Sequence, residues 1–253
     1  MVDVDKILIV GGGIAGLTLA AALQARGFEI DLIERNPTWR TLGAGMANQP
    51  NAMRALRALE LDRAVADRGL VLHRWGFCDQ QGELLYEIDL QDFWNGVGPF
   101  VGIERAKLQQ ALLLGAVSVP YRLGTSVVGL WQDHDGVSVC FSDRSSGRYD
   151  LVVGADGIAS SIRELAFGPN PPAGAGHIAW RSVVPMRPAK LSDLPSSLEI
   201  VASSVSVLWA ATALTDLVMS PSRTSTMMCA AGWRACGVAL MGLPSPFRSF
   251  SRP

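Results

Sequence analysis

The chain has 253 residues, of which 49% are hydrophobic and 18% charged, and its formal net charge is −1. A chain of this size can bury a large core in one or two domains, and without a strongly basic stretch we expect no nucleic-acid partner. The four cysteines and three histidines follow no metal-ligand spacing. We therefore expect no metal site, and a reducing cytoplasm as the location of the protein.

The first 34 residues predict a strand, a turn, a helix and a second strand. Residues 6–10 form a continuous apolar run, as in a parallel strand that is buried on both faces. A helix is expected over residues 17–26, with Gly27 as its stop, and a second strand over residues 28–33 that ends at Glu34. The whole segment therefore has the order of elements of a nucleotide-binding βαβ unit.

The turn after the first strand carries glycines at positions 11, 13 and 16, which match the pattern G-x-G-x-x-G. The first glycine permits a tight turn, the second lets the backbone approach a pyrophosphate, and the third lets helix and strand pack closely. The helix N-terminus adds N–H donors and a partial positive charge. Glu34 can accept hydrogen bonds from a ribose. The segment predicts dinucleotide binding, and the alternative is a turn that merely needs positive φ angles.

The remaining elements follow in chain order. Residues 150–157, Asp-Leu-Val-Val-Gly-Ala-Asp-Gly, predict a strand that ends on an acidic residue between two glycines. A turn at residues 135–136 separates two strands of a hairpin. Helices are expected over residues 50–68, 103–114 and 158–167, and strands over residues 73–78, 83–89, 117–121, 126–132, 137–142, 149–153 and 178–185.

Five motifs in this order resemble those of the group A flavoprotein monooxygenases, the p-hydroxybenzoate hydroxylase-like enzymes, and among them the salicylate and urate hydroxylase branch. The resemblance runs from about residue 7 to residue 185. It implies an α/β fold with a Rossmann-like FAD-binding domain around a parallel central sheet, plus an incomplete β-rich substrate domain. The motifs are residues 11–16, Glu34-Arg35, residues 43–46 (Gly-Ala-Gly-Met), residues 103–105 (Ile-Glu-Arg) and residues 154–157 (Gly-Ala-Asp-Gly).

The resemblance also implies domain boundaries. Residues 1–72 and 102–176 would form the discontinuous FAD-binding domain, and residues 73–101 and 177–195 part of the sheet of the substrate domain. Residues 196–253 would be an atypical tail. The substrate side carries notable arginine and aromatic side chains, although aromatic residues in such a sheet are more often core than ligand contacts. These are Arg74, Trp75, Phe77, Phe93, Trp94, Trp180 and Arg181.

Each matching residue receives an implied role. Asp156 would lie near the FAD pyrophosphate, with a helix N-cap as the compatible alternative, and Arg163 is either a phosphate contact or a surface arginine. Arg35 is a candidate for contact with phosphate or adenine, or for simple solvation. The other implied roles are the pyrophosphate for Gly11, Gly13, Ile14, Ala15 and Gly16; the adenosine ribose for Glu34; the flavin for the backbone of Gly45 and Ala47; the phosphates or ribitol for Arg105; and the adenine pocket for the backbone of Val127.

The chemistry implied by the resemblance belongs to the flavin. NAD(P)H reduces FAD, O2 adds to give a C4a-hydroperoxide, and oxygen passes to a small aromatic substrate. No catalytic side chain is assigned, because the protein supplies position, polarity and exclusion of water. The resemblance thus implies an FAD- and NAD(P)H-dependent monooxygenase. The alternatives are an epoxidase, a simple flavin reductase and a non-catalytic dinucleotide-binding protein.

Residues 196–253 contain no Lys, His, Asn, Gln or Tyr, and we find no second Gly-Asp flavin segment of the family type in them. We favour a truncated or frameshifted reading frame after about residue 195. A membrane-associating tail is a second explanation, although its uncharged run falls short of the ~20 residues that span a bilayer. A divergent tail that completes the substrate sheet is the third. We expect weak FAD binding or none, and impaired activity.

Overall fold

The computed structural model describes residues 4–39, 45–78 and 84–173, with the backbone alone at residues 76–78 and 84. It also describes the backbone of three later strands, β13 (Ile178–Pro185), β14 (Ser206–Trp209) and β15 (Thr212–Met219). The candidate site lies within residues 4–39, 45–78 and 84–173, and the side chains of its residues are described.

The centre of the molecule is a parallel sheet in the strand order β12-β1-β2-β8. Its strands are β1 (Lys6–Val10), β2 (Glu29–Glu34), β8 (Tyr121–Leu123) and β12 (Leu151–Gly154). Ile7 and Ile9 of β1 belong to one buried cluster, whereas Leu8 and Val10 belong to another on the opposite face. The apolar run is continuous because both faces of the strand are covered. The predicted α/β fold with a parallel central sheet is confirmed.

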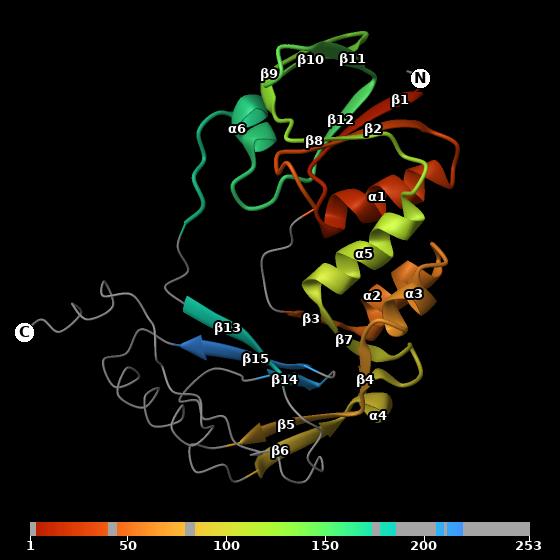
Figure 1. Ribbon diagram of the computed structural model, residues 1–253, viewed down its shortest axis with the longest axis vertical. Helices are drawn as coiled ribbons and strands as arrows, with labels where there is room; N and C mark the ends of the chain where they lie inside the picture. The colour runs from red at the N-terminus through yellow and green to blue at the C-terminus, as the bar shows by residue number, and fades with distance from the viewer. Residues whose placement is uncertain are drawn as a thin grey trace, which may run out of the picture.

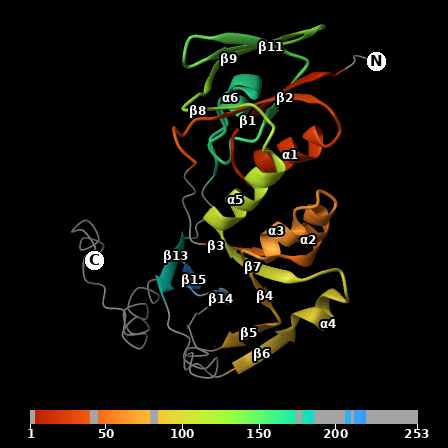
Figure 2. The ribbon, with the colours of Figure 1, turned by 45° about the vertical axis from the view of Figure 1, so that its right-hand side comes forward.

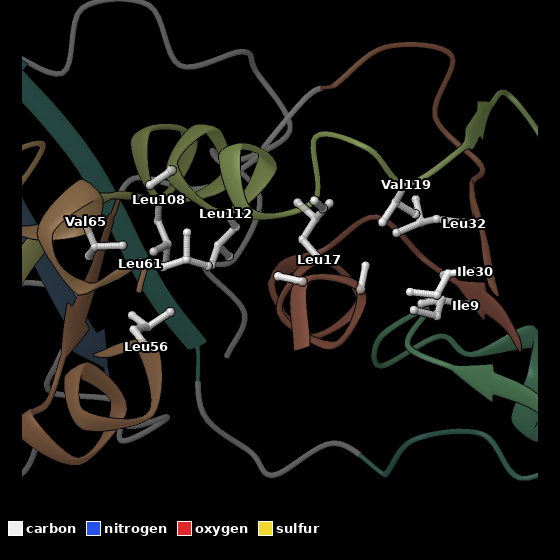
Figure 3. Packing of buried hydrophobic residues seen from close by; sticks show 14 of the residues in the cluster. Ile9, Leu17, Ile30, Leu32, Leu56, Leu61, Val65, Leu108, Leu112 and Val119 are labelled. Atoms are coloured by element: carbon white, nitrogen blue, oxygen red, sulfur yellow. The ribbon is translucent and has the colours of Figure 1, made fainter. Parts of the chain in front are cut away.

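Helices cover one face of this sheet. Helix α1 (Ile14–Gln24) packs beside α5 (Arg105–Gly115), and α2 (Pro50–Arg57) and α3 (Asp62–Ala66) lie further along α5 (Figures 1 and 2). Figure 3 shows one continuous apolar cluster from Ile9 and Leu32 through Leu17 to Val65. Burial of such side chains supplies about 1.5–3 kcal/mol each, and it holds α5 in a fixed position against α1.

A three-stranded antiparallel sheet covers the opposite face of the parallel sheet (Figure 1). It consists of β9 (Val127–Asp133), β10 (Gly136–Phe141) and β11 (Ser146–Tyr149). Val139 and Phe141 alternate with more exposed residues and pack against Leu8 and Val10. The predicted hairpin is present, but its turn residues are His134 and Asp135, one position earlier than predicted, because Gly136 already pairs with Asp133 as the first residue of β10. Helix α6 (Ser161–Phe167) follows β12.

The phenol of Tyr149 ties this antiparallel sheet to the parallel one. Its hydroxyl donates to Oδ2 of Asp31 at 2.8 Å, and burial together with this hydrogen bond raises the pKa of Tyr149 to about 12. In the unfolded chain a tyrosine ionises near pH ~10. The stability that this group contributes is therefore complete below pH ~10 and is lost as the pH rises towards the folded pKa.

Alkaline titration tests this linkage. In wild type, the last tyrosinate absorbance should appear only when the pH approaches the raised pKa of Tyr149, and Tyr149→Phe should remove that last step. The variant should also lose the bond to Asp31, at a cost of roughly 1.5–3 kcal/mol of unfolding free energy near neutral pH. An unchanged tyrosinate titration in the variant would contradict the assignment.

The other end of the molecule is rich in strands. β3 (Gly45–Asn48), β7 (Phe100–Glu104) and β4 (Leu70–Leu72) form an antiparallel sheet. β5 (Arg74–Cys78) and β6 (Leu84–Asp89), at the places of two predicted strands, pair as an antiparallel hairpin, and α4 (Leu90–Trp94) follows. β15 pairs antiparallel with both β13 and β14. β14 and β15 belong to residues 196–253, which the sequence predicted as an atypical tail. None of the described helices has the length and apolar character needed to cross a bilayer.

Several element boundaries differ from the predicted ones, and two of these differences follow from contacts with distant segments. The helix predicted from residue 103 begins at Arg105, because Ile103 and Glu104 pair with β3 as the end of β7. The strand predicted over residues 149–153 divides at Asp150, whose Oδ2 accepts from the N–H groups of Asp5 and Lys6. In addition, residues 50–68 form two helices rather than one, the strand expected at 117–121 lies at 121–123, and the helix expected from 158 begins at Ser161.

Asn48 at the end of β3 is a buried polar residue without full hydrogen bonding. Asn48 is 6% exposed and lies opposite the buried Val101 in the β3–β7 pair. Its Nδ2 donates to no acceptor in the described part of the chain. A buried donor without a partner costs about 1–3 kcal/mol. We predict that Asn48→Val raises the unfolding free energy by ~1 kcal/mol in denaturant titrations, because a β-branched apolar residue suits a buried strand. Lower stability of the variant would show that the amide has a partner in solution.

Candidate functional site

The first glycine turn is shaped by close backbone contacts. Gly11 has φ +112, and its N–H donates to the carbonyl of Ile33 at 2.8 Å. A Cβ on Gly11 would overlap the carbonyl oxygen of Ala155 and lie 2.9 Å from the N of Asp156, and a Cβ on Gly16 would overlap the carbonyl oxygen of Gly11. The two glycine-rich turns, about 140 residues apart in sequence, therefore abut at the ends of β1 and β12.

Gly13 differs from these two glycines because a Cβ on it would meet nothing within 4 Å. It is the N-cap residue of α1, and among the described residues no side chain caps this helix. Among the described residues, the N–H groups of the first turn of α1 have no acceptor, and the space on the Cβ side of Gly13 is open at the positive end of the helix dipole. This space fits an anion such as a pyrophosphate.

Glu34, the last residue of β2, is held beside the same turn. Its Oε2 accepts from the N–H of Gly12 at 2.8 Å, and its Oε1 accepts from the backbone N–H and the Nδ2 of Asn36 at 2.9 and 2.8 Å. The indole of Trp39 covers Gly12, with Cζ3 only 2.5 Å from where a Cβ would lie. Arg35 is exposed and forms no hydrogen bond or ion pair with any described residue.

Asp156 lies in the second glycine turn, where its carboxylate organises the start of α6. Oδ1 accepts from Oγ of Ser160 at 2.5 Å, and Oδ2 accepts from Oγ of Ser161 and the N–H of Ile162, both at 3.1 Å. Burial raises the pKa of Asp156, but these hydrogen bonds outweigh it and leave the pKa below the ordinary value. The N-cap residue itself is Ser160, which accepts from the N–H of Arg163.

Arg163 is engaged locally in this turn. Its Nη2 donates to the carbonyl of Ile158 at 2.7 Å. The guanidinium therefore supports the turn after Asp156, a local role that neither sequence alternative included.

Helix α5 connects the glycine turn with the strands at the other end of the site. Gly45 of β3 pairs with Glu104, and Ala47 pairs with Gly102. Arg105 follows Glu104 as the first residue of α5, is exposed, and has no hydrogen bond or ion pair with a described residue. One helical turn later, about 6 Å along the axis, Gln109 donates from Nε2 to the carbonyl of Gly12 at 3.1 Å.

Val127 lies at the Glu34 end of the site. Its side chain is 4% exposed and packs with Val10 and Ile33, and two residues earlier the N–H of Thr125 donates to the carbonyl of Glu34 at 3.0 Å. The predicted residues thus follow one path, from Val127 and Glu34 through the two glycine turns and along α5 to Arg105 and β3.

Three residues of the site were not among the predicted ones, namely Gly12, Trp39 and Gln109. Gln109 and Gly12 are 97 residues apart in the sequence, and no local sequence pattern predicts their contact. The available signal was the spacing of four residues between Arg105 and Gln109, which places both on one side of a helix.

The candidate substrate residues are less well placed for binding. Arg74 pairs through Nη1 with Oε1 of Glu87 at 3.2 Å, and Trp75 packs edge-on against Phe100 with ring centroids 5.9 Å apart. Phe93 and Trp94 contact each other at 5.7 Å. The side chains of Phe77, Trp180 and Arg181 lie outside the described residues. Trp75 thus packs against the core residue Phe100, as the core interpretation expects, whereas Phe93 is 66% exposed and lies outside the core.

The sequence pattern of the FAD binding domain family matches residues 4–214. The chain belongs to this family. The match extends beyond residue 185, where the resemblance recognised in the sequence ended, and it includes β14 and part of β15. FAD is thus the cofactor of the family, and the open N-terminus of α1 beside the Glu34 carboxylate fits its pyrophosphate and adenosine ribose.

Curated relatives of this FAD-binding chain are monooxygenases. It is 35% identical over 178 residues to aurachin C monooxygenase/isomerase of Stigmatella aurantiaca, covering 70% of this chain and 46% of the relative. It is 31% identical over 218 residues to 3-hydroxybenzoate 6-hydroxylase of Klebsiella oxytoca, covering 83% and 52% respectively. The chain therefore spans about half the length of these relatives.

The fold of this chain is also found in a solved structure. Klebsiella pneumoniae HpxO, crystallised with FAD and uric acid, superimposes with a TM-score of 0.72 at 25% identity. The superposition covers 87% of this chain and 57% of that one.

Proposed function

We propose that this chain binds FAD and takes part in the NAD(P)H-dependent hydroxylation of a small aromatic compound by O2. The observation that carries the proposal is the junction of two glycine turns at the ends of β1 and β12, with an open helix N-terminus and the Glu34 carboxylate beside it. The identity to monooxygenases supports the type of reaction.

In this proposal the N–H groups of the α1 N-terminus bind the pyrophosphate, and the side of α1 near Gly13 leaves room for it. The carboxylate of Glu34 retains one lone-pair site, on Oε2, for a ribose hydroxyl. Asp156 keeps the second turn in place beside the first. The other proposed contacts are Gly11, Ile14, Ala15 and Gly16 at the pyrophosphate, Arg35 at phosphate or adenine, the backbone of Val127 at adenine, Arg105 at the phosphates or ribitol, and the backbone of Gly45 and Ala47 at the flavin.

When bound, FAD supplies the redox chemistry of hydride acceptance and oxygen activation. The chain contributes binding and orientation. The exposed guanidinium of Arg105 stands at the start of α5 beside Gly45, where it can neutralise phosphate charge or donate to ribitol. The buried core beneath α1 and α5 keeps these groups in a constant geometry, as orientation of a reacting centre requires.

The substrate in this proposal is a small ring compound bearing oxygen substituents. The names of relatives include 3-hydroxybenzoate, and HpxO was crystallised with uric acid. We propose NAD(P)H as the reductant, no nucleic-acid partner, and the cytoplasm as location, which the scattered cysteines and the net charge of −1 support.

Titration of the purified chain with FAD tests the proposal. Flavin fluorescence should change saturably, and addition of NAD(P)H should bleach the flavin band near ~450 nm. A screen of hydroxylated benzoates and purines then follows product formation. NAD(P)H oxidation without product would indicate a flavin reductase, and FAD binding without NAD(P)H oxidation a non-catalytic nucleotide-binding protein. Absence of saturable FAD binding at millimolar concentrations would refute the proposal.

A further inference from the structure

The two peptide groups on either side of the Gly12 Cα each form a hydrogen bond with a side chain that is distant in sequence. The N–H of Gly12 donates to Glu34 at 2.8 Å, and its carbonyl accepts from Nε2 of Gln109 at 3.1 Å. We propose that Gln109 is a positioning residue, which holds the Gly12 carbonyl and thereby aims the N–H of Gly13 at the pyrophosphate. This inference rests on the proposed function, because it takes FAD as the source of the pyrophosphate.

The planarity of the peptide bond couples the Gly12 carbonyl to the N–H of Gly13. The carbonyl of Gly12 and the N–H of Gly13 belong to the same trans peptide and therefore point in opposite directions. With the carbonyl held towards α5, the N–H of Gly13 points away from α5. No described residue accepts that N–H, and the space beside Gly13 is open for at least 4 Å around a Cβ position. The orientation of one carbonyl thus decides whether a donor faces the anion.

This peptide needs an external restraint because glycines surround it. Residues 11–13 are all glycine, and glycine adopts positive and negative φ angles about equally well. Rotation of the peptide between Gly12 and Gly13 would direct a carbonyl oxygen at the anion, which is repulsive. A hydrogen bond from a side chain on a rigid helix removes this freedom before the cofactor binds.

Packing of α5 makes Gln109 a suitable restraint. Its neighbour Leu108 is 2% exposed, and Ala111 and Leu112 are fully buried in the cluster that includes Leu17 of α1. Gln109 itself is partly buried. Since the helix is fixed on both sides of Gln109, the amide group reaches the Gly12 carbonyl without a large loss of side-chain freedom on binding.

Replacement of Gln109 by Leu removes the donor and keeps a similar volume. The dissociation constant of FAD, measured by flavin fluorescence titration, should rise about tenfold, as expected for one positioned hydrogen bond. The midpoint of thermal unfolding without FAD should change little. Gln110→Leu is the matched control, since Gln110 is the exposed next residue of the same helix, and it should leave FAD affinity unchanged.

The pH dependence of FAD affinity in Gln109→Glu distinguishes a positioning role of Gln109 from a purely structural one, because a purely structural role would not change this dependence. A carboxylate faces the Gly12 carbonyl as an acceptor and repels it, so FAD should bind weakly at neutral pH. On acidification towards the ordinary glutamate pKa of ~4.3, the protonated carboxyl regains a donor and FAD affinity should rise. Wild type and Gln110→Glu should show no such rise. A flat pH profile for Gln109→Glu would overturn the inference.

Amide NMR of the glycine-labelled chain without FAD separates this inference from the proposed function. Gln109→Leu should shift or broaden the signals of Gly12 and Gly13, whereas Gln110→Leu should not. If wild type takes up no FAD, the proposed function fails, and these signals alone decide whether Gln109 restrains the turn. If FAD binds equally to wild type and Gln109→Leu, the proposed function stands and the positioning role of Gln109 is wrong.

Discussion

Gly13→Ala should weaken FAD binding by about 10- to 100-fold, which corresponds to ~1.4–2.7 kcal/mol, while the chain remains folded. The added Cβ meets no protein atom within 4 Å, so the folded state has no clash to relieve. The same methyl group would extend into the space before the N-terminus of α1, where the second glycine of the motif lets the backbone approach a pyrophosphate. The backbone at Gly13 is extended, with φ −77, which alanine adopts without strain.

The measurement pairs FAD titration with denaturant unfolding of the chain without FAD. The unfolding free energy of Gly13→Ala should be lower than that of wild type by no more than ~1 kcal/mol, since alanine is a poorer N-cap than glycine. Gly27→Ala provides the opposite control, because Gly27 has φ +84 and no atom near its Cβ position. That variant should lose ~1–2 kcal/mol of stability and retain its FAD affinity. Unchanged FAD binding by Gly13→Ala would place the pyrophosphate elsewhere.

Gly11→Ala should have the largest effect on stability, about 2–5 kcal/mol of unfolding free energy. Two independent costs combine at this position. The residue has φ +112, which strains any residue with a side chain, and its Cβ would overlap the Ala155 carbonyl. That carbonyl cannot move freely, since the N–H of Ala155 donates to the carbonyl of Val10 at 2.7 Å. Relief of the clash therefore separates the ends of β1 and β12.

Chemical denaturation of Gly11→Ala and Gly27→Ala in parallel measures the free-energy cost of the overlap with the Ala155 carbonyl separately from the cost of the positive φ. Both variants carry the strain of a positive φ, but only Gly11→Ala meets backbone atoms of the second turn. The difference between their unfolding free energies should be about 1–3 kcal/mol, and Gly11→Ala should also lose FAD binding. Equal losses of stability in the two variants would mean that the two glycine turns are not in contact.

Much of the candidate site could be predicted from the sequence because its signals are local. The apolar run of β1, the glycines at positions 11, 13 and 16, and Glu34 at the end of β2 all lie within one βαβ unit. Their spacing alone places Glu34 beside the turn, because neighbouring parallel strands end at the same edge of a sheet. The structure has this arrangement, with Glu34 accepting from Gly12.

Side-chain partners within the site could not be predicted in this way. The sequence predicted Asp156 as a cofactor contact, with a helix N-cap as a compatible role, and Arg163 as a phosphate contact or a surface arginine. In the structure Asp156 accepts from Ser160, Ser161 and Ile162, and Arg163 donates to Ile158. Competing hydrogen-bond donors within a few ångströms decide such cases, and sequence spacing does not measure those distances.

The sequence by itself determined the fold class, the family and the position of the glycine turns, because these depend on periodicity and on residue types close together in the chain. Tertiary structure alone decided where α5 begins, since Ile103 and Glu104 pair with β3. It alone brought Gln109 to the Gly12 carbonyl and Tyr149 to Asp31. These contacts join segments that are about a hundred residues apart, and only the packing of helices and sheets onto a shared core sets their distance and direction.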